Sequence, residues 1–175
     1  MGVGLPVLMV VTLAVGISAL TLRRSHAASA RRAYVGTWTY VSGTAKVGPG
    51  FALDAKPAPD GSSERSLEGK SQIVEERDGK LWFSGEDQTN CWFELRFTGD
   101  RAEAVPGTTM DCQMRGAEPP ATTRVTVVGM SMAMDGEGRA HISGESRFSM
   151  DMHGTKRDID ITIDGVAVRE PPPKD

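Results

Sequence analysis

Residues 139–152 alternate strictly between small or apolar side chains and polar ones, and this alternation constrains the fold more than any other feature of the chain. The small or apolar side is formed by Ala140, Ile142, Gly144, Ser146, Phe148, Met150 and Met152. A period of two places successive residues on opposite faces of a β-strand, one face buried and the other in water. Similar alternation recurs through most of the chain after residue 33, so the sequence predicts an all-β domain.

Turn signals divide this domain into about eight or nine antiparallel strands. They are predicted at residues 33–43, 66–76, 80–85, 90–98, 101–105, 109–114, 122–134, 139–152 and 157–168. A segment rich in proline and glycine, residues 46–63, is predicted to be a long mobile loop, and no helix is predicted within the domain. Consecutive strands with short connections predict an up-and-down meander that closes into a barrel, with a small open β-sandwich as the alternative.

The N-terminal segment contains an uncharged run at residues 5–22, which predicts a hydrophobic helix before the domain. Ala28-Ser29-Ala30 has the small-x-small pattern of a signal-peptidase site, so we expect residues 1–30 to be a cleaved signal peptide and the protein to be exported, periplasmic or extracellular. The alternative is a single-pass membrane anchor, because Arg23 and Arg24 follow the run and no basic residue precedes it. A third interpretation is a buried apolar stretch.

The domain is expected to span residues 31–170, with a disordered tail at 171–175 that begins with three prolines. After Ala30 the chain carries 18 Lys and Arg residues against 23 Asp and Glu residues, a formal charge of −5. Charges of both signs are mixed along the strands, which argues against a nucleic-acid partner. Contact with a membrane is expected only through residues 5–22, if they are retained.

Two cysteines, Cys91 and Cys112, are predicted to form a disulfide bond, because an even cysteine count is typical of exported chains. A turn near residues 99–100 would fold the chain back and bring Cys112 towards Cys91. Two free buried thiols are the alternative. A metal pair is less favoured, because no other cysteine and no suitably spaced histidine accompanies them.

Gly36-Thr37-Trp38 resembles the Gly-x-Trp motif that opens lipocalins and their calycin relatives. The resemblance implies that Trp38 seals one end of a barrel and that Arg169 packs over its ring through a cation–π contact. The middle-loop motif and the C-terminal helix of that family are not found. The wider pattern, over residues 33–168, is also similar to small exported bacterial proteins of unassigned function.

A non-enzymatic protein that binds a small apolar ligand is the function we expect, with no cofactor and no metal. The three histidines are His26, His141 and His153, and none lies in a nucleophile or paired-carboxylate motif. The pocket is expected to be lined by inward-facing aromatic and methionine side chains, namely Phe93, Phe97, Met130, Met132, Met134, Phe148 and Met150.

Two alternative functions remain open. A structural or adhesive module of the cell envelope would use Trp82 or Trp92 to bind a protein or glycan. A periplasmic metal binder would use the thioethers of the methionines, since soft sulfur ligands bind Cu(I). Its candidate ligands are Met130, Met132 and Met134 on one strand and Met150, Met152 and His153 at the end of the next.

Overall fold

The computed structural model describes residues 29–49, 56–57, 59–85, 88–98, 100–114, 122–136, 138–152 and 155–171. The chain divides into two compact units, Met1–Tyr34 and Val35–Asp175. In the first unit the described residues form a short helix at 29–34. No helix among the residues described is both long and apolar enough to cross a membrane. The predicted hydrophobic helix at 5–22 lies outside the described residues.

The beginning of the first predicted strand is wrong. Residues 33 and 34 belong to the helix, and β1 (Gly36–Val47) starts after it. Residues 28–34 contain three alanines and two arginines, which favour helix over strand. β1 also continues four residues beyond the predicted end at residue 43, into the segment predicted to be a loop.

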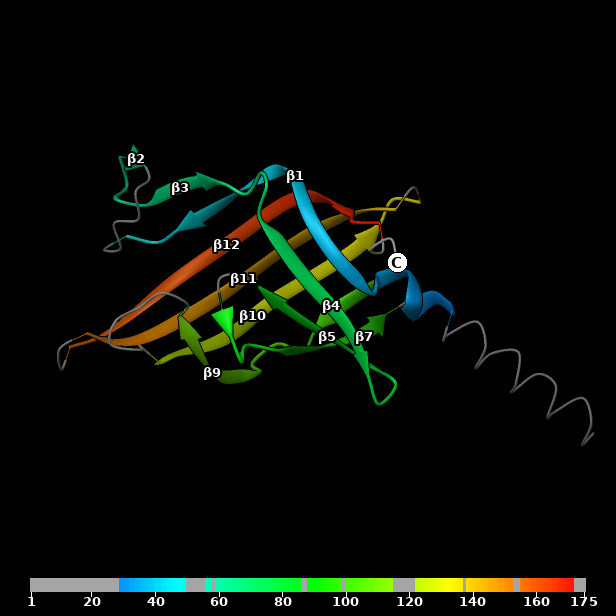
Figure 1. Ribbon diagram of the computed structural model, residues 1–175. Helices are drawn as coiled ribbons and strands as arrows, with labels where there is room; N and C mark the ends of the chain where they lie inside the picture. Colours follow the sequence, from blue (N-terminus) through cyan, green and yellow to red (C-terminus); the bar gives the residue numbers. More distant parts are fainter. Residues whose placement is uncertain are drawn as a thin grey trace, which may run out of the picture. The chain divides into compact units, whose positions relative to one another are not determined.

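The second unit contains one antiparallel sheet, in which twelve strands are described (Figure 1). After β1 they are β2 (Lys56–Pro57), β3 (Ser63–Ser66), β4 (Ser71–Arg77), β5 (Lys80–Gly85), β6 (Gln88–Thr89), β7 (Phe93–Thr98), β8 (Arg101–Ala104), β9 (Thr109–Met114), β10 (Thr122–Met134), β11 (Arg139–Met152) and β12 (Thr155–Arg169). The bounds of β5, β9, β10 and β11 agree with the predicted ones residue for residue.

Eight strands pair into a closed circuit, in the order β1-β4-β5-β7-β8-β10-β11-β12 and back to β1. Each pair of neighbours along this circuit is antiparallel, so the predicted all-β, antiparallel fold is confirmed. The three longest strands, β10, β11 and β12, form one continuous wall (Figure 1). A closed circuit pairs each of its eight members on both sides and creates an interior that alternate residues of every strand face.

The remaining strands pair with members of this circuit or with one another. β3 and β4 both pair with β1, at its later and earlier residues respectively, and they are separated by the turn at 67–70. In the same way β8 and β9 both pair with β10 and are separated by residues 105–108. The predicted strand at 66–76 is therefore two strands with a bend between them. β2 adds to β3, and β6 adds to β9.

Two β-bulges reverse the alternation within single strands. The pairing of β1 with β12 shifts between Tyr40 and Ser42, and that of β10 with β11 shifts between Val127 and Gly129. The extra residue is a valine in each case, and both valines are exposed, Val41 at 47% and Val128 at 42%. Inward residues therefore have even numbers before Val41 and odd numbers after it.

One end of the circuit's interior is filled by side chains. We call it the packed end, because inward residues of all eight circuit strands are buried there. They are Trp38, Val74, Leu81, Leu95, Ala102, Ala104, Met132, Ala140, Ile142 and Ala167, each at most 4% exposed. Alternating large and small side chains allow this layer to close around the indole of Trp38.

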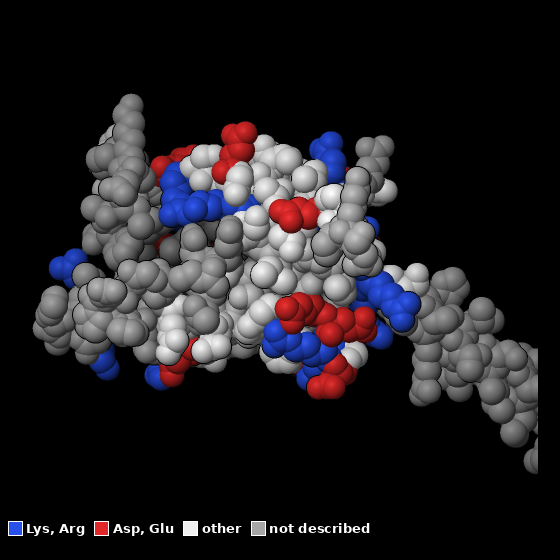
Figure 2. Space-filling model, in the orientation of Figure 1, with Lys and Arg blue, Asp and Glu red and all other residues white. Residues whose placement is uncertain are grey.

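The outer face carries charges of both signs in cross-strand pairs, and Figure 2 shows acidic and basic side chains side by side. Arg147 on β11 holds Asp160 on β12 through Nε–Oδ1 and Nη2–Oδ2 distances of 2.7 and 3.2 Å. Its hydrogen bonds lower the pKa of the Asp160 carboxyl. Lys80 and Glu94 make a similar pair at 2.8 Å. Mixed pairing of this kind agrees with the predicted solvated face.

The predicted disulfide bond between Cys91 and Cys112 is confirmed. Cys91 precedes β7, Cys112 lies in β9, and both residues are fully buried. The bond joins residues 21 apart in sequence whose Cα atoms are 4.8 Å apart. A disulfide bond is compatible with an exported location.

Asp60 anchors the turn that leads into β3. Its Oδ1 accepts hydrogen bonds from the Ser62 hydroxyl and backbone amide, at 2.5 and 3.0 Å, and Lys46 lies 3.3 Å from its Oδ2. These bonds, those of Ser62 first, lower the pKa of Asp60 from 3.8 to about 2. A carboxyl whose pKa is lowered by folding stabilises the fold above its unfolded pKa of about 3.9, and loses that contribution as the pH falls towards 2.

We expect the Asp60 carboxyl to titrate near pH 2 in an NMR titration of the side-chain carbon. Ser62→Ala removes the larger cause and should raise this midpoint towards 3.8, whereas Lys46→Gln should raise it less. A midpoint close to 4 in the unmodified protein would contradict the arrangement of this turn.

Candidate functional site

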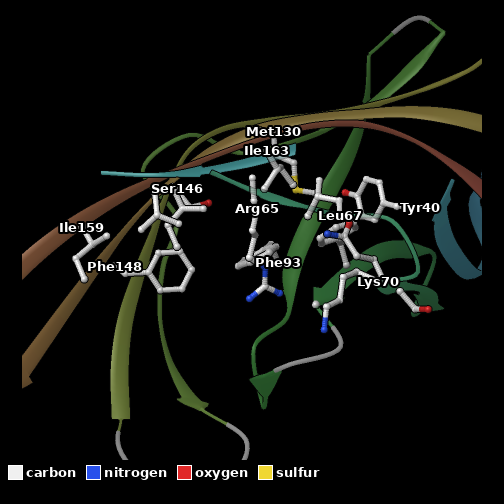
Figure 3. Close-up of a pocket in the computed structure, with 18 of the residues that line it drawn as sticks. Tyr40, Arg65, Leu67, Lys70, Phe93, Met130, Ser146, Phe148, Ile159 and Ile163 are labelled. Atoms are coloured by element: carbon white, nitrogen blue, oxygen red, sulfur yellow. The ribbon is translucent and has the colours of Figure 1, made fainter. Parts of the chain in front are cut away.

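A cavity of about 250 Å³ lies inside the circuit, beyond the packed end (Figure 3). It is larger than the roughly 150 Å³ cavity that binds benzene in an engineered protein, and slightly smaller than most drug-sized ligand sites. The lining comprises Tyr40, Ala45, Val47, Arg65, Leu67, Lys70, Ser71, Gln72, Phe83, Gly85, Phe93, Met130, Gly144, Ser146, Phe148, Met150, Ile159, Ile161 and Ile163. Most of these side chains are apolar.

The apolar wall comes chiefly from β11 and β12. Ile159, Ile161 and Ile163 project inward at alternate positions of β12, as the sequence predicts. Phe148 pairs with Ile159 across the two strands, so aromatic and aliphatic surfaces adjoin. On the other side Phe83 and Phe93 stack with ring centroids 5.9 Å apart. Such walls remove apolar ligand surface from water and are typical of small-molecule sites.

The polar side of the cavity is built on the β1 bulge. The turn at 67–70 is hydrogen-bonded to β1, through Leu67 N to Gly43 O at 3.0 Å and Gly69 N to Tyr40 O at 2.9 Å. Tyr40 N in turn donates to Lys70 O at 2.9 Å. Arg65 on β3 pairs with Ala45 on β1, which lines the cavity, and the two residues therefore project on the same face. This geometry places both cations at the cavity.

Two buried polar atoms in the cavity wall have no hydrogen-bond partner among the described residues. They are Tyr40 Oη and Gln72 Oε1. Tyr40 is only 1% exposed, and burial raises the pKa of its hydroxyl well above the usual 10, a rise that the nearby Gln72 amide only partly offsets. The two groups act on each other without reaching hydrogen-bond geometry. Leaving a buried donor unpaired costs about 1–3 kcal/mol, so this site favours a ligand that pairs with it.

Four of the seven predicted pocket residues line the cavity: Phe93, Met130, Phe148 and Met150. The other three do not. Met132 is fully buried in the packed end, and Met134 lies two residues closer to the hairpin turn. Phe97 pairs with Ala102 and so shares the inward face of β7 with Leu95, but it lies one position from the β7–β8 turn, is 37% exposed and does not line the cavity. The alternating pattern predicts the correct, inward face for Met132, but the register of the strands determines how far along the interior it lies.

Of the two residues predicted to close one end of a barrel, Trp38 belongs to the packed end, whereas Arg169 is exposed. Trp38 is fully buried, and Arg169 is its register partner on β12, so both project from the same face. A Cβ added at Gly36 would lie 3.2 Å from Arg169 Cδ, which shows how closely the arginine stem covers the start of β1. The contact of Arg169 with the indole stays a prediction.

Sequence reasoning missed most of the polar side of the site. Arg65, Lys70, Tyr40 and Gln72 were not predicted as pocket residues. The segment before residue 66 lacks a period of two, and the bulge at Val41 reverses the inward parity of the β1 residues that follow Tyr40. These residues come together only through the hydrogen bonds between the turn at 67–70 and β1, and no local sequence signal marks them as pocket residues.

The remaining candidates lie on the outer face or outside the described residues. His141 is exposed and pairs with Asp164, Nε2 to Oδ2 at 3.2 Å. Trp82 and Trp92 are half-buried, and the guanidinium of Arg77 lies 4.1 Å from the Trp92 ring centroid. On β11, Met130 is paired with Gly144, whereas Met150 lies six residues further along the same strand and pairs with Arg157 on β12. His153 lies outside the described residues, as does the side chain of Met152.

No cluster of three or more His, Cys, Asp or Glu side chains that could hold a metal ion occurs in the described part of the chain. The sequence matches no protein-family model, and no curated protein or solved structure is similar enough to count as a match. Function must therefore be inferred from the cavity itself.

Proposed function

We propose that the protein is an exported, lipocalin-like β-barrel that holds a small apolar molecule in its interior. The single observation that carries this proposal is the cavity of about 250 Å³, whose wall is mostly apolar and lies within the closed circuit. A core formed only for stability would be filled at native density, as the packed end is. An unfilled apolar space lowers the stability of the fold, and such a space is expected where a ligand occupies the cavity.

The lipocalin-like part of the proposal has separate support. Gly36-Thr37-Trp38 opens β1, Trp38 is buried in the packed end, and Arg169 pairs with it. Sequential antiparallel strands in a closed circuit are the connectivity expected of an up-and-down barrel. The disulfide bond supports export, since such bonds persist in oxidising compartments.

Ser146→Leu tests occupancy of the cavity. Ser146 lines it opposite Ile161 on β12, and a leucine there would fill part of the space. Naphthalene, followed by its own fluorescence, is expected to bind the full chain saturably with one molecule per chain. We expect Ser146→Leu to weaken this binding at least tenfold, roughly the effect of losing 1.4 kcal/mol of contacts, without lowering the melting temperature.

Ser149→Leu is the matched control. It makes the same change on the same strand, but Ser149 projects outward and donates to Asp158 at 2.7 Å. Naphthalene binding should be unchanged in this variant. Equal affinities in the two leucine variants, or no saturable binding to the unmodified chain, would overturn the proposed function. If naphthalene binds as expected, native mass spectrometry after exposure to a lipid extract would identify a natural occupant.

A further inference from the structure

The charged residues of the cavity wall all have one sign. Arg65 and Lys70 line it, and no Asp or Glu occurs among the described lining residues. The rest of the molecule is acidic, with 23 Asp and Glu residues in the whole chain against 20 Lys and Arg. We propose that the cavity selects a single-chain amphiphile with an anionic head group, such as a medium-chain carboxylic acid, and binds that head group at Arg65 and Lys70. This inference rests on the proposed function.

The backbone positions of both cations are fixed by hydrogen bonds to β1. Arg65 is held by the pairing of β3 with β1, and Lys70 by its carbonyl, which accepts from Tyr40 N at 2.9 Å. Figure 3 shows their nitrogen-bearing ends on one side of the cavity, away from Met130 and Ile163. Two cationic groups on one side of the cavity can provide charge-assisted hydrogen bonds, and the planar guanidinium matches the two oxygens of a carboxylate.

The unpartnered buried groups lie at the same end of the cavity. The hydroxyl of Tyr40 has no partner among the described residues. Tyr40 lies two positions after Trp38 on β1, and Trp38 pairs with Gln72 on β4. Because burial raises the pKa of Tyr40, its hydroxyl keeps its proton at neutral pH and can donate to an anionic oxygen. An anionic head group would therefore satisfy a donor that the protein itself leaves unpaired.

The opposite end of the cavity suits a hydrocarbon tail. Figure 3 shows Phe148 and Ile159 at the end away from Tyr40, with Arg65 between. Met150 follows Phe148 on the same face of β11 and also lines the cavity. A volume of about 250 Å³ suits one short chain rather than a two-chain lipid. The cavity thus has a polar end at Tyr40 and Lys70, a second cation at Arg65 in its middle, and an apolar end at Phe148 and Ile159.

Three ligands with the same tail test this inference: octanoate, 1-octanol and octylammonium, titrated calorimetrically into the full chain at pH 7.5. We expect octanoate to bind at least tenfold more tightly than octanol, and octylammonium to bind most weakly, because charge-assisted bonds are stronger than neutral ones. Arg65→Gln and Lys70→Gln should each weaken octanoate binding roughly tenfold and leave octanol binding unchanged. Tyr40→Phe should weaken octanoate binding less than either.

Arg96→Gln and Lys80→Gln are the matched controls, since each removes one positive charge from the outer face. Neither should change the preference for octanoate over octanol. Equal binding of the three ligands, or equal losses in the cavity and control variants, would overturn the anionic selectivity while leaving the proposed function intact. Failure of both octanol and naphthalene to bind would overturn the proposed function instead.

Discussion

Gly43→Ala is expected to lower the free energy of unfolding by about 4 kcal/mol, a large part of the 5–15 kcal/mol typical of a domain. Gly43 faces Gly165 across β1 and β12, and its φ of +137° lies in a region that favours glycine. A Cβ at Gly43 would lie 2.5 Å from Gly165 Cα and 2.6 Å from Asp164 O. Both neighbours are backbone atoms, so the strands themselves would have to separate.

The measurement is urea unfolding of the variant and the unmodified chain, followed by circular dichroism. Two control variants separate the collision from the backbone strain. Gly136→Ala has a φ of +90° but nothing within 4 Å of its added Cβ, and should cost only about 1 kcal/mol. Gly165→Ala has no such φ, yet its Cβ would lie 2.6 Å from Ser42 O, so it should cost about 2 kcal/mol.

Equal losses in Gly43→Ala and Gly136→Ala would contradict the close approach of β1 and β12. This approach matters for the site, because the Tyr40 ring lies over Gly165, with Cδ1 2.9 Å from where a Cβ would be. The missing side chains of two glycines thus provide the space in which Tyr40 forms part of the cavity wall.

Local patterns were sufficient to predict most strands. The bounds of β10 and β11 follow from alternation at both sides of a turn rich in glycine and acidic residues, and the two signals agree. The bulges were not predictable in this way. An extra residue such as Val41 reverses the inward parity, so a template with a constant period of two fails after it. The last two residues of β1, Lys46 and Val47, fall in the segment that its proline and glycine content predicts to be a loop.

The cavity was predictable only in part, for a related reason. Alternation tells which face a side chain occupies, but its depth along the interior depends on register, which bulges and turns determine together. Met130 and Met132 share a face of β10, yet the first lines the cavity and the second fills the packed end. Arg65 and Lys70 reach the cavity through the bent β3–β4 segment, whose course depends on hydrogen bonds to β1 rather than on its own periodicity.

Loss of the disulfide bond is expected to lower the free energy of unfolding by about 3 kcal/mol, and the melting temperature by roughly 10 °C. The bond closes a loop between residues 21 apart, and its main effect in the chain-entropy description is to restrict the unfolded chain. The double variant Cys91→Ala with Cys112→Ala avoids placing new polar groups in a fully buried position. Thermal unfolding followed by circular dichroism measures the difference.

Dithiothreitol provides the internal comparison for this variant. It should lower the melting temperature of the unmodified chain to nearly that of the double alanine variant, and should leave the variant unchanged. Two titratable thiols in the unfolded, unreduced chain would show that the bond does not form. Because a reducing compartment would remove the same contribution of about 3 kcal/mol, this fold is expected to be more stable where disulfides persist, which is compatible with an exported location.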